Sequence, residues 1–143
     1  MLTIELVPRT VWYSNLRSEL SKEQWDFLRR ACYRKAEYVC EICGGEGPKW
    51  PVECHEIWEF DDSQRTQTLK GLIALCPDCH SVKHIGLAGM LGKGQATRAH
   101  LARVNGWSAK QAQDCVRKAF ALWEERSQHD WTLDISWIEQ HLP

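Results

Sequence analysis

The pattern of apolar and polar residues predicts three longer helices. The first covers residues 22–36 and follows the sequence Ser21-Lys-Glu-Gln, which has the S-x-x-Q form of a capping box. The second covers residues 96–104 and ends at Asn105-Gly106, a helix stop signal. The third covers residues 109–125 and carries one apolar stripe at helical spacing. The stripe consists of Ala112, Cys115, Val116, Ala119, Phe120 and Trp123.

Shorter apolar runs in the middle of the chain predict two strands and a short helix. The strands cover residues 51–60 and 69–75, and the polar loop 61–66 joins them. Pro77 is suited to the first turn of a helix, where its missing N–H leaves no hydrogen bond unmade, and this helix should reach about residue 85. The glycines at positions 86, 89, 92 and 94 are expected to interrupt regular structure after it.

Both ends of the chain are expected to accompany this central part. Residues 4–13 are β-branched and aromatic enough for an extended segment, which Pro8 interrupts. The tail, residues 131–142, is short and aromatic, so we expect it to pack back on the rest of the protein.

Length and composition indicate a globular domain. The chain has 143 residues, of which 43% are hydrophobic and 8 are Trp, and this is enough apolar material for a core. No run of ~18 apolar residues is present, so no membrane span is expected, and the N-terminal sequence lacks the pattern of a signal peptide. We therefore expect a cytoplasmic protein, in which 7 cysteines indicate metal ligands or free thiols rather than disulfides.

Charge is distributed unevenly along the chain, although the net charge is only −1. Acidic residues crowd between Glu53 and Asp62, whereas none lies between Asp78 and Asp114. The basic residues of this acid-free stretch are Lys83, Lys93, Arg98, Arg103 and Lys110. Such a stretch is either a solvated surface or a surface that faces phosphate groups.

Four cysteines have the spacing of a zinc site. They form two C-x₂-C pairs, namely Cys40 with Cys43 and Cys76 with Cys79. Two such pairs can complete a tetrahedral shell, and zinc is the usual ion in it. The alternative is that they pack as small apolar residues, but Gly44-Gly45 and Pro77 supply the turn chemistry that zinc knuckles need. Cys32 and Cys115 lie on apolar helix stripes, so we predict that both are core residues.

Three histidines bracket these cysteines. His80 and His84 are one helical turn apart, so both can face the same ion. His55 lies on the predicted strand that precedes this helix. A purely structural zinc site needs none of the three, so they favour a second, chemical site beside the zinc.

The cysteines and histidines together resemble those of HNH endonucleases, members of the His-Me finger (ββα-metal) group. The resemblance covers residues 40–84. It rests on the first cysteine pair, the strand with His55, the segment Leu72-Ile-Ala-Leu-Cys-Pro-Asp-Cys-His80, and Lys83-His84.

The resemblance implies both a fold and a reaction. The implied fold is one α+β domain over residues 1–143. Its ββα-metal core lies at about 38–86, and the segments 1–37 and 96–142 wrap this core. The implied reaction is metal-dependent hydrolysis of DNA phosphodiester bonds.

Individual roles follow from the same resemblance. His55 corresponds to the general base that takes a proton from the attacking water. His80 and His84 would hold a second divalent ion (Mg²⁺, Mn²⁺, Ni²⁺ or Zn²⁺) that stabilises the leaving 3′ oxygen. The candidates for contacts with DNA phosphates are Lys83, Arg98 and Arg103, each of which can equally be solvated.

Two positions depart from the family pattern. The residue before the base is usually an Asp or His that binds the catalytic metal, whereas here it is Cys54, and a thiolate favours zinc over magnesium. Because neighbours on a regular strand point to opposite faces, Cys54 reaches the ion only if the strand bends, and otherwise Glu53 can replace it. Gly71 stands where the family has Asn, and it can neither bind metal nor tie down a loop. The loop side chains that can compensate are Asp61, Asp62 and Gln64.

These departures leave two other interpretations open. The chain can be a zinc-stabilised nucleic-acid-binding module without nuclease activity, or a domain that binds a protein partner through Trp-rich surfaces. The retained histidines favour the nuclease, with DNA as its partner. Nothing in the sequence predicts an oligomeric state.

Overall fold

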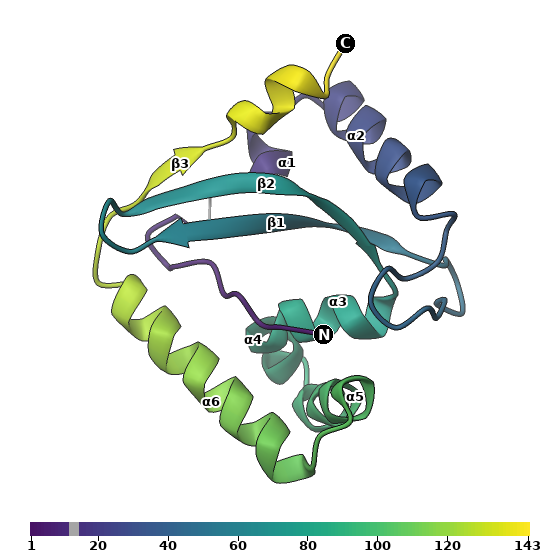
Figure 1. The fold of residues 1–143 in the computed structure, drawn as a ribbon, viewed down its shortest axis with the longest axis vertical. Coiled ribbons are helices and arrows are strands. Elements are labelled where there is room, and N and C mark those ends of the chain that lie inside the picture. Colours follow the sequence, from purple (N-terminus) through teal and green to yellow (C-terminus); the bar gives the residue numbers. More distant parts are fainter. Residues whose placement is uncertain (12–14) are drawn as a thin grey trace.

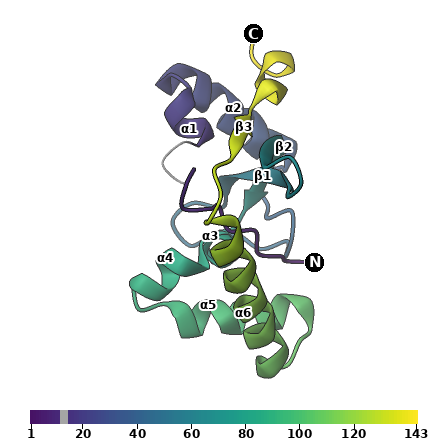
Figure 2. The same ribbon diagram turned by 90° about the vertical axis from the view of Figure 1, so that its left-hand side faces the viewer.

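The computed structural model describes residues 1–11 and 15–143, and these form an α+β fold. In chain order the elements are α1 (Leu16–Glu19), α2 (Lys22–Lys35), β1 (Glu53–Asp61), β2 (Thr66–Leu75), α3 (Pro77–Lys83), α4 (Ile85–Met90), α5 (Gly94–Asn105), α6 (Ala109–Arg126), β3 (Thr132–Asp134) and the 3₁₀ helix η1 (Ser136–Gln140). The sheet crosses the middle of the molecule (Figure 1). It separates α1, α2 and η1 from α3 to α6, and the perpendicular view agrees (Figure 2).

The three longer helices form where the apolar pattern predicts them. The capping box of α2 is complete, because Ser21 and Gln24 each accept the other's backbone N–H. Ser108 and Gln111 cap α6 in the same way. Helix α5 begins slightly earlier than predicted and ends at Gly106, whose φ of 66° is the left-handed conformation that glycine adopts without strain.

The two predicted strands pair as an antiparallel hairpin. Their register runs from Glu53 opposite Leu75 to Asp61 opposite Thr66, with an irregularity after Ile57. Strand β2 begins earlier than predicted. The short strand β3 was not expected from the sequence, and it pairs in parallel with β2. Strand β1 is therefore an edge strand of the sheet.

The predicted helix over residues 77–85 is divided into two. Helix α3 ends at Lys83, and α4 begins after His84, whose φ of −113° and ψ of 45° are not helical. Gly86 and Gly89 lie inside α4, so the expected loss of regular structure at these two glycines is wrong. Gly92, which follows α4, has the left-handed φ of 75° that ends the segment.

Two apolar clusters hold these layers together. The first joins the end of β2 to the helices on one side of the sheet and includes Leu75, Val82 and Leu101. Cys32 is buried in this cluster and Cys115 packs against it, as predicted. The second cluster contains Leu16, Leu28, Trp58 and Leu69, together with apolar residues of the C-terminal tail. The tail therefore packs back on the fold, as the sequence predicts.

The N-terminal segment lies against the helices without forming a strand. Leu2 exchanges backbone hydrogen bonds with the side chain of Asn105, and the indole of Trp123 donates to the carbonyl of Val7. The last two residues of the predicted segment 4–13 lie outside the described residues. In the described part of the chain, no helix has the length and apolar character needed to cross a bilayer.

Candidate functional site

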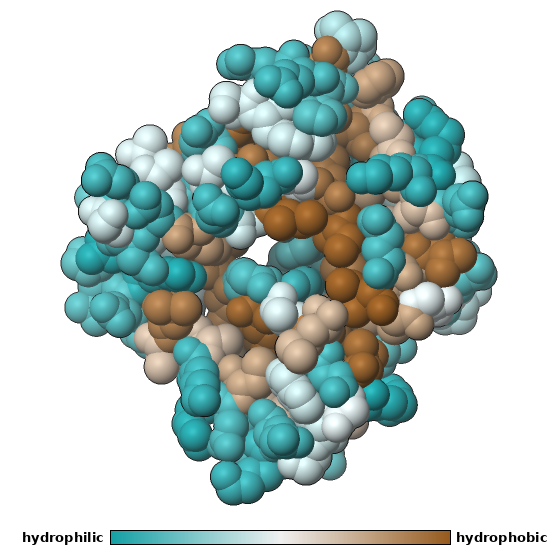
Figure 3. Space-filling view, in the orientation of Figure 1, coloured by the Kyte–Doolittle hydropathy of each residue, from teal (hydrophilic) through white to brown (hydrophobic). Residues whose placement is uncertain are grey.

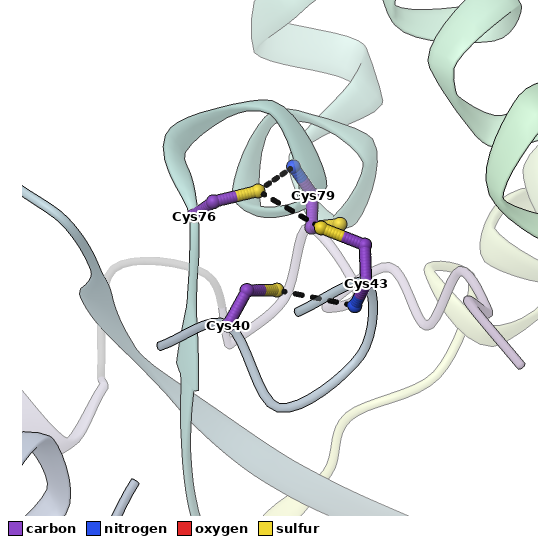
Figure 4. A group of neighbouring side chains, drawn as sticks. All are labelled: Cys40, Cys43, Cys76 and Cys79. Atoms are coloured by element: carbon purple, nitrogen blue, oxygen red, sulfur yellow. Dashed lines mark hydrogen bonds between the residues drawn. The ribbon is translucent and has the colours of Figure 1, made fainter. Parts of the chain in front are cut away.

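Four cysteine sulfurs converge where the loop after α2 meets the start of α3 (Figure 4). We call Cys40, Cys43, Cys76 and Cys79 the cysteine clamp. Its sulfur atoms all lie within 4.8 Å of one another. Gly44, at a φ of 76°, completes the first turn, and Cys76 caps α3 with Pro77 behind it. The two C-x₂-C pairs that were separate in sequence therefore form one group.

Backbone N–H groups are directed at the clamp sulfurs. The N–H of Cys43 donates to the sulfur of Cys40 at 3.5 Å, and the N–H of Cys79 donates to that of Cys76 at 3.4 Å. The N–H of Gly45 donates to the sulfur of Cys43 at 3.3 Å. Such donors stabilise negative charge on sulfur, as the outer shell of a metal–thiolate site requires.

Burial and backbone donors shift the pKa values of the clamp thiols in different directions. Burial opposes ionisation of Cys40, but backbone N–H donors outweigh it and lower the pKa of this thiol to about 7. Burial raises the pKa of Cys76 to about 11 and also raises the pKa of Cys79. Four thiol groups this close together are the ligand set that zinc prefers, and a dication among them would favour their thiolate forms, so the donor set fits a structural zinc ion.

Three histidines form a second group nearby. The centre of the His55 ring lies 5.2 Å from the ring centres of both His80 and His84. The ring centres of His80 and His84 are 4.7 Å apart. The Nε2 atoms of His80 and His84 face each other at 3.1 Å. The three residues offer ligand atoms within 4.8 Å of one another, so this group can also hold a metal ion. We call it the histidine cluster.

His55 is the most deeply placed member of the cluster. Its side chain is 8% exposed, and its Nδ1 atom is buried without a hydrogen-bond partner in the described structure. Burial, and then the positive charge of its two neighbours, lowers the pKa of His55 to about 2. Partial desolvation, followed by His80, lowers the pKa of His84 to about 4. Both rings are therefore neutral at neutral pH and have a free nitrogen lone pair.

Glu53 supports the cluster from outside. Its Oε1 atom lies 3.0 Å from Nδ1 of His80, and its Oε2 atom accepts from the indole of Trp50 at 3.1 Å. A carboxylate on Nδ1 fixes the ring and leaves Nε2 free for an ion, which is the usual arrangement around metal-bound histidines. The sequence left open that Glu53 replaces Cys54 as a metal ligand, but in the structure its carboxylate contacts His80 and is not one of the three groups that could share an ion.

Cys54 does not join the histidine cluster. The strand stays regular at this point, so Cys54 faces away from His55 and its thiol interacts with Cys32 of α2. This hydrogen bond, together with burial, raises the pKa of Cys54. The expected contribution of Cys54 to a catalytic ion therefore finds no support in the geometry.

The three candidate phosphate contacts have different surroundings. Lys83 is 9% exposed, and its amino group bonds to the hydroxyl of Thr3 and to Glu5 at 2.9 Å, so it is paired inside the protein. Arg98 is exposed on α5. Arg103 is also exposed, but its guanidinium contacts a ring nitrogen of His100. Of the three, Arg98 and Arg103 therefore lie at the surface, whereas Lys83 does not.

The loop residues named as possible substitutes lie at the other end of the hairpin. Asp61 accepts the backbone N–H groups of Ser63 and Gln64 within the turn, and Asp62 pairs with Arg126 of α6. Gly71 is opposite Ile57, whose side chain is the near neighbour that a Cβ at position 71 would meet, at 3.9 Å. Asp61, Asp62 and Gln64 therefore lie at the turn of the hairpin, away from the end that carries His55.

A cavity of about 700 Å³ adjoins the histidine cluster. The N-terminal segment, α2, β1, α4 and α6 contribute to its wall, which includes Trp25 of α2, Trp58 of β1 and Trp123 of α6. In the space-filling view the molecule is hollowed near its centre, and hydrophobic residues border part of the opening (Figure 3). The cavity leaves the cluster open to a ligand larger than water.

Comparison with known proteins yields no relative of this chain. No family model matches the sequence, and no curated protein or solved structure matches it significantly. The functional argument therefore depends on the two side-chain groups themselves.

Proposed function

We propose that this protein is a metal-dependent endonuclease of the HNH type, with a ββα-metal core and DNA as its substrate. One observation carries the proposal. His55 on the first strand of a hairpin, His80 on the helix after that hairpin and His84 directly beyond the end of that helix lie close together. The cysteine clamp joins the loop before the hairpin to the start of this helix, so a zinc ion there would fix the distance between the strand and the helix.

His55 is the proposed general base. Its ring is neutral, and its buried Nδ1 has no other partner in the described structure. The negative charge of a bound phosphodiester would raise the low pKa of this ring, so that it can take a proton from the water that attacks phosphorus. His80 and His84 are the proposed ligands of a divalent ion, through the Nε2 atoms that face each other. When bound, this ion supplies positive charge that stabilises the leaving 3′ oxygen.

Glu53 takes over part of the role of the Asp or His that HNH endonucleases usually have at the position of Cys54. Its carboxylate holds the Nδ1–H of His80 and so keeps the ligand nitrogen directed at the ion. Its negative charge beside the cluster also favours a bound cation. The proposal therefore does not require Cys54 as a ligand.

A zinc-stabilised nucleic-acid-binding module without catalysis is the second candidate. The observation in its favour concerns the two positions that differ from the pattern of HNH endonucleases. Cys54 faces α2 and Gly71 has no side chain, so neither can bind a catalytic ion. In that case the histidine cluster would hold an ion only for structural purposes.

Plasmid nicking separates these candidates. The purified chain is incubated with supercoiled DNA and with Mg²⁺, Mn²⁺, Ni²⁺ or Zn²⁺ in turn, and the DNA forms are resolved on a gel. We expect nicked or linear product with at least one ion and none with a chelator. His84→Ala should lose the activity, whereas His129→Ala, which changes an exposed histidine elsewhere, should retain it.

Two other outcomes would contradict the nuclease, and a third would contradict the site assigned to it. DNA that is bound in a mobility-shift assay but never cut would establish the binding module. Capture of a protein partner through exposed Trp side chains, without DNA affinity, would favour an interaction domain. Equal cleavage by His84→Ala and the unmodified chain would place the activity outside the histidine cluster.

A further inference from the structure

A chain of hydrogen bonds connects helix α5 to the cysteine clamp. The Nε2 atom of His100 lies 3.2 Å from the sulfur of Cys79, and a terminal nitrogen of Arg103 lies 3.2 Å from Nδ1 of the same ring. Cys79 is 0% exposed, so this contact reaches the interior, although Arg103 itself is at the surface. Helix α5 packs against α3, which carries Cys79, and this packing brings the groups together.

The direction of both hydrogen bonds follows from the chemistry of Arg103. A guanidinium has only N–H donors and stays protonated in proteins, so Nδ1 of His100 must be the acceptor. A ring whose Nδ1 accepts is neutral and carries its proton on Nε2. That Nε2–H is directed at the sulfur of Cys79, which is therefore the acceptor. A neutral thiol sulfur accepts only weakly, whereas a sulfur that carries negative charge, as in a zinc–thiolate bond, accepts strongly, so this donor suits a zinc ligand.

We propose that Arg103 and His100 form a relay that donates a hydrogen bond to the sulfur of Cys79 and so strengthens zinc binding by the cysteine clamp. The arrangement of donors around the clamp supports this proposal. The sulfurs of Cys40, Cys43 and Cys76 each accept a backbone N–H, whereas Cys79 accepts the ring N–H of His100. The relay thus supplies Cys79 with the donor that the backbone supplies to the other three sulfurs.

The relay also gives Arg103 a role that differs from a phosphate contact. If Arg103 only contacted DNA, its replacement would change neither the position of the proton on His100 nor the affinity for zinc. Arg98 lies on the same helix and is exposed, so it serves as the matched control for Arg103.

The position of the proton on His100 is the first test. Long-range ¹⁵N–¹H NMR on the zinc-loaded full-length chain reports which ring nitrogen is protonated. We expect the proton on Nε2 in the unmodified chain and in Arg98→Met, and a shift toward Nδ1 in Arg103→Met. A proton on Nδ1 of His100 in the unmodified chain would overturn the relay.

Zinc affinity is the second test, measured by competition with a chromogenic chelator. Outer-shell partners of metal ligands are typically worth about 10–100-fold in affinity, so His100→Leu should lose about that much. His100→Gln places an amide N–H near the position of Nε2 and should restore most of the loss, and Arg98→Met should bind zinc like the unmodified chain. Unchanged affinity in His100→Leu, or no restoration by His100→Gln, would contradict the proposal.

Neither test depends on cleavage. The NMR measurement uses the unmodified chain, so it decides the question even if His100→Leu fails to fold. Both measurements are made without DNA, so a failure of the relay and a failure of the proposed nuclease can be told apart.

Discussion

Replacing Cys40 by Ser should unfold the protein rather than only weaken it. Cys40 is buried, and its sulfur belongs to the four that lie within 4.8 Å of one another. A serine hydroxyl at that position cannot supply the thiolate that zinc prefers, so Cys40→Ser should lose the ion. Because the sulfurs hold two distant segments together, loss of the ion also releases the hairpin between them.

The size of the effect can be worked out from the clamp. Cys43 and Cys76 are 33 positions apart, and their sulfurs are separated by 3.6 Å. By the relation used for disulfides, a crosslink that closes a loop of this length lowers the conformational entropy of the unfolded chain and so stabilises the folded state by about 4 kcal/mol. Structural zinc sites bind with roughly 10–16 kcal/mol in peptides. A domain has roughly 5–15 kcal/mol of total stability, so either figure removes a large share of it.

Circular dichroism during urea unfolding, combined with zinc determination, measures this prediction. The unmodified chain should contain zinc and unfold cooperatively, and addition of a strong chelator should reproduce the Cys40→Ser result. Cys115→Ser is the control, because Cys115 packs against the core outside the clamp and should keep the zinc. A Cys40→Ser protein that lacks zinc but unfolds at the same urea concentration as the unmodified chain would refute the reasoning.

Three further predictions concern the histidine cluster. Glu53→Gln should weaken the binding of a second ion by about 10–100-fold and leave the clamp zinc in place, because His80 loses its carboxylate partner. Isothermal titration with Mn²⁺ or Ni²⁺ measures this affinity, and an unchanged affinity would contradict the prediction. Cys54→Ala should not change the affinity for that ion, since its thiol faces α2; a loss comparable to that of Glu53→Gln would contradict the geometry. Burial lowers the pKa of His55 from 6.5 to about 2, so the folded chain keeps this ring neutral while the unfolded chain protonates it below pH 6.5. As the pH falls below 6.5, the unmodified chain should therefore lose stability relative to His55→Ala, at a rate approaching about 1.4 kcal/mol per pH unit. Parallel unfolding curves at several pH values test this sign, and a difference that does not vary with pH would refute it.

The features that the sequence predicts best depend on residues close together in the chain. The capping box at Ser21 and the stop at Gly106 involve partners within a few positions, so local chemistry is sufficient to identify them. The cysteine clamp was predictable for a similar reason, since each pair forms its own turn. The α+β class was an expectation from the resemblance to HNH endonucleases, and the helices and strands of the structure agree with it.

The features that the sequence does not predict depend on partners far away. Lys83 was a candidate for a surface contact, but the N-terminal segment folds over it and Glu5 pairs with it. The break at His84 and the pairing of β3 with β2 also arise from tertiary packing. His100 could have been noticed as a histidine in the acid-free stretch, but its contact with Cys79 becomes visible only when α5 is placed against α3.

The rate of DNA cleavage by His55→Ala tests the central claim most directly. Both proteins are compared under single-turnover conditions with the divalent ion that gives most product, after circular dichroism has shown that the variant is folded and zinc analysis that its clamp is occupied. If His55 is the general base, the cleavage rate constant should fall by roughly 10²–10⁴-fold. Equal rate constants for the variant and the unmodified chain would contradict the account.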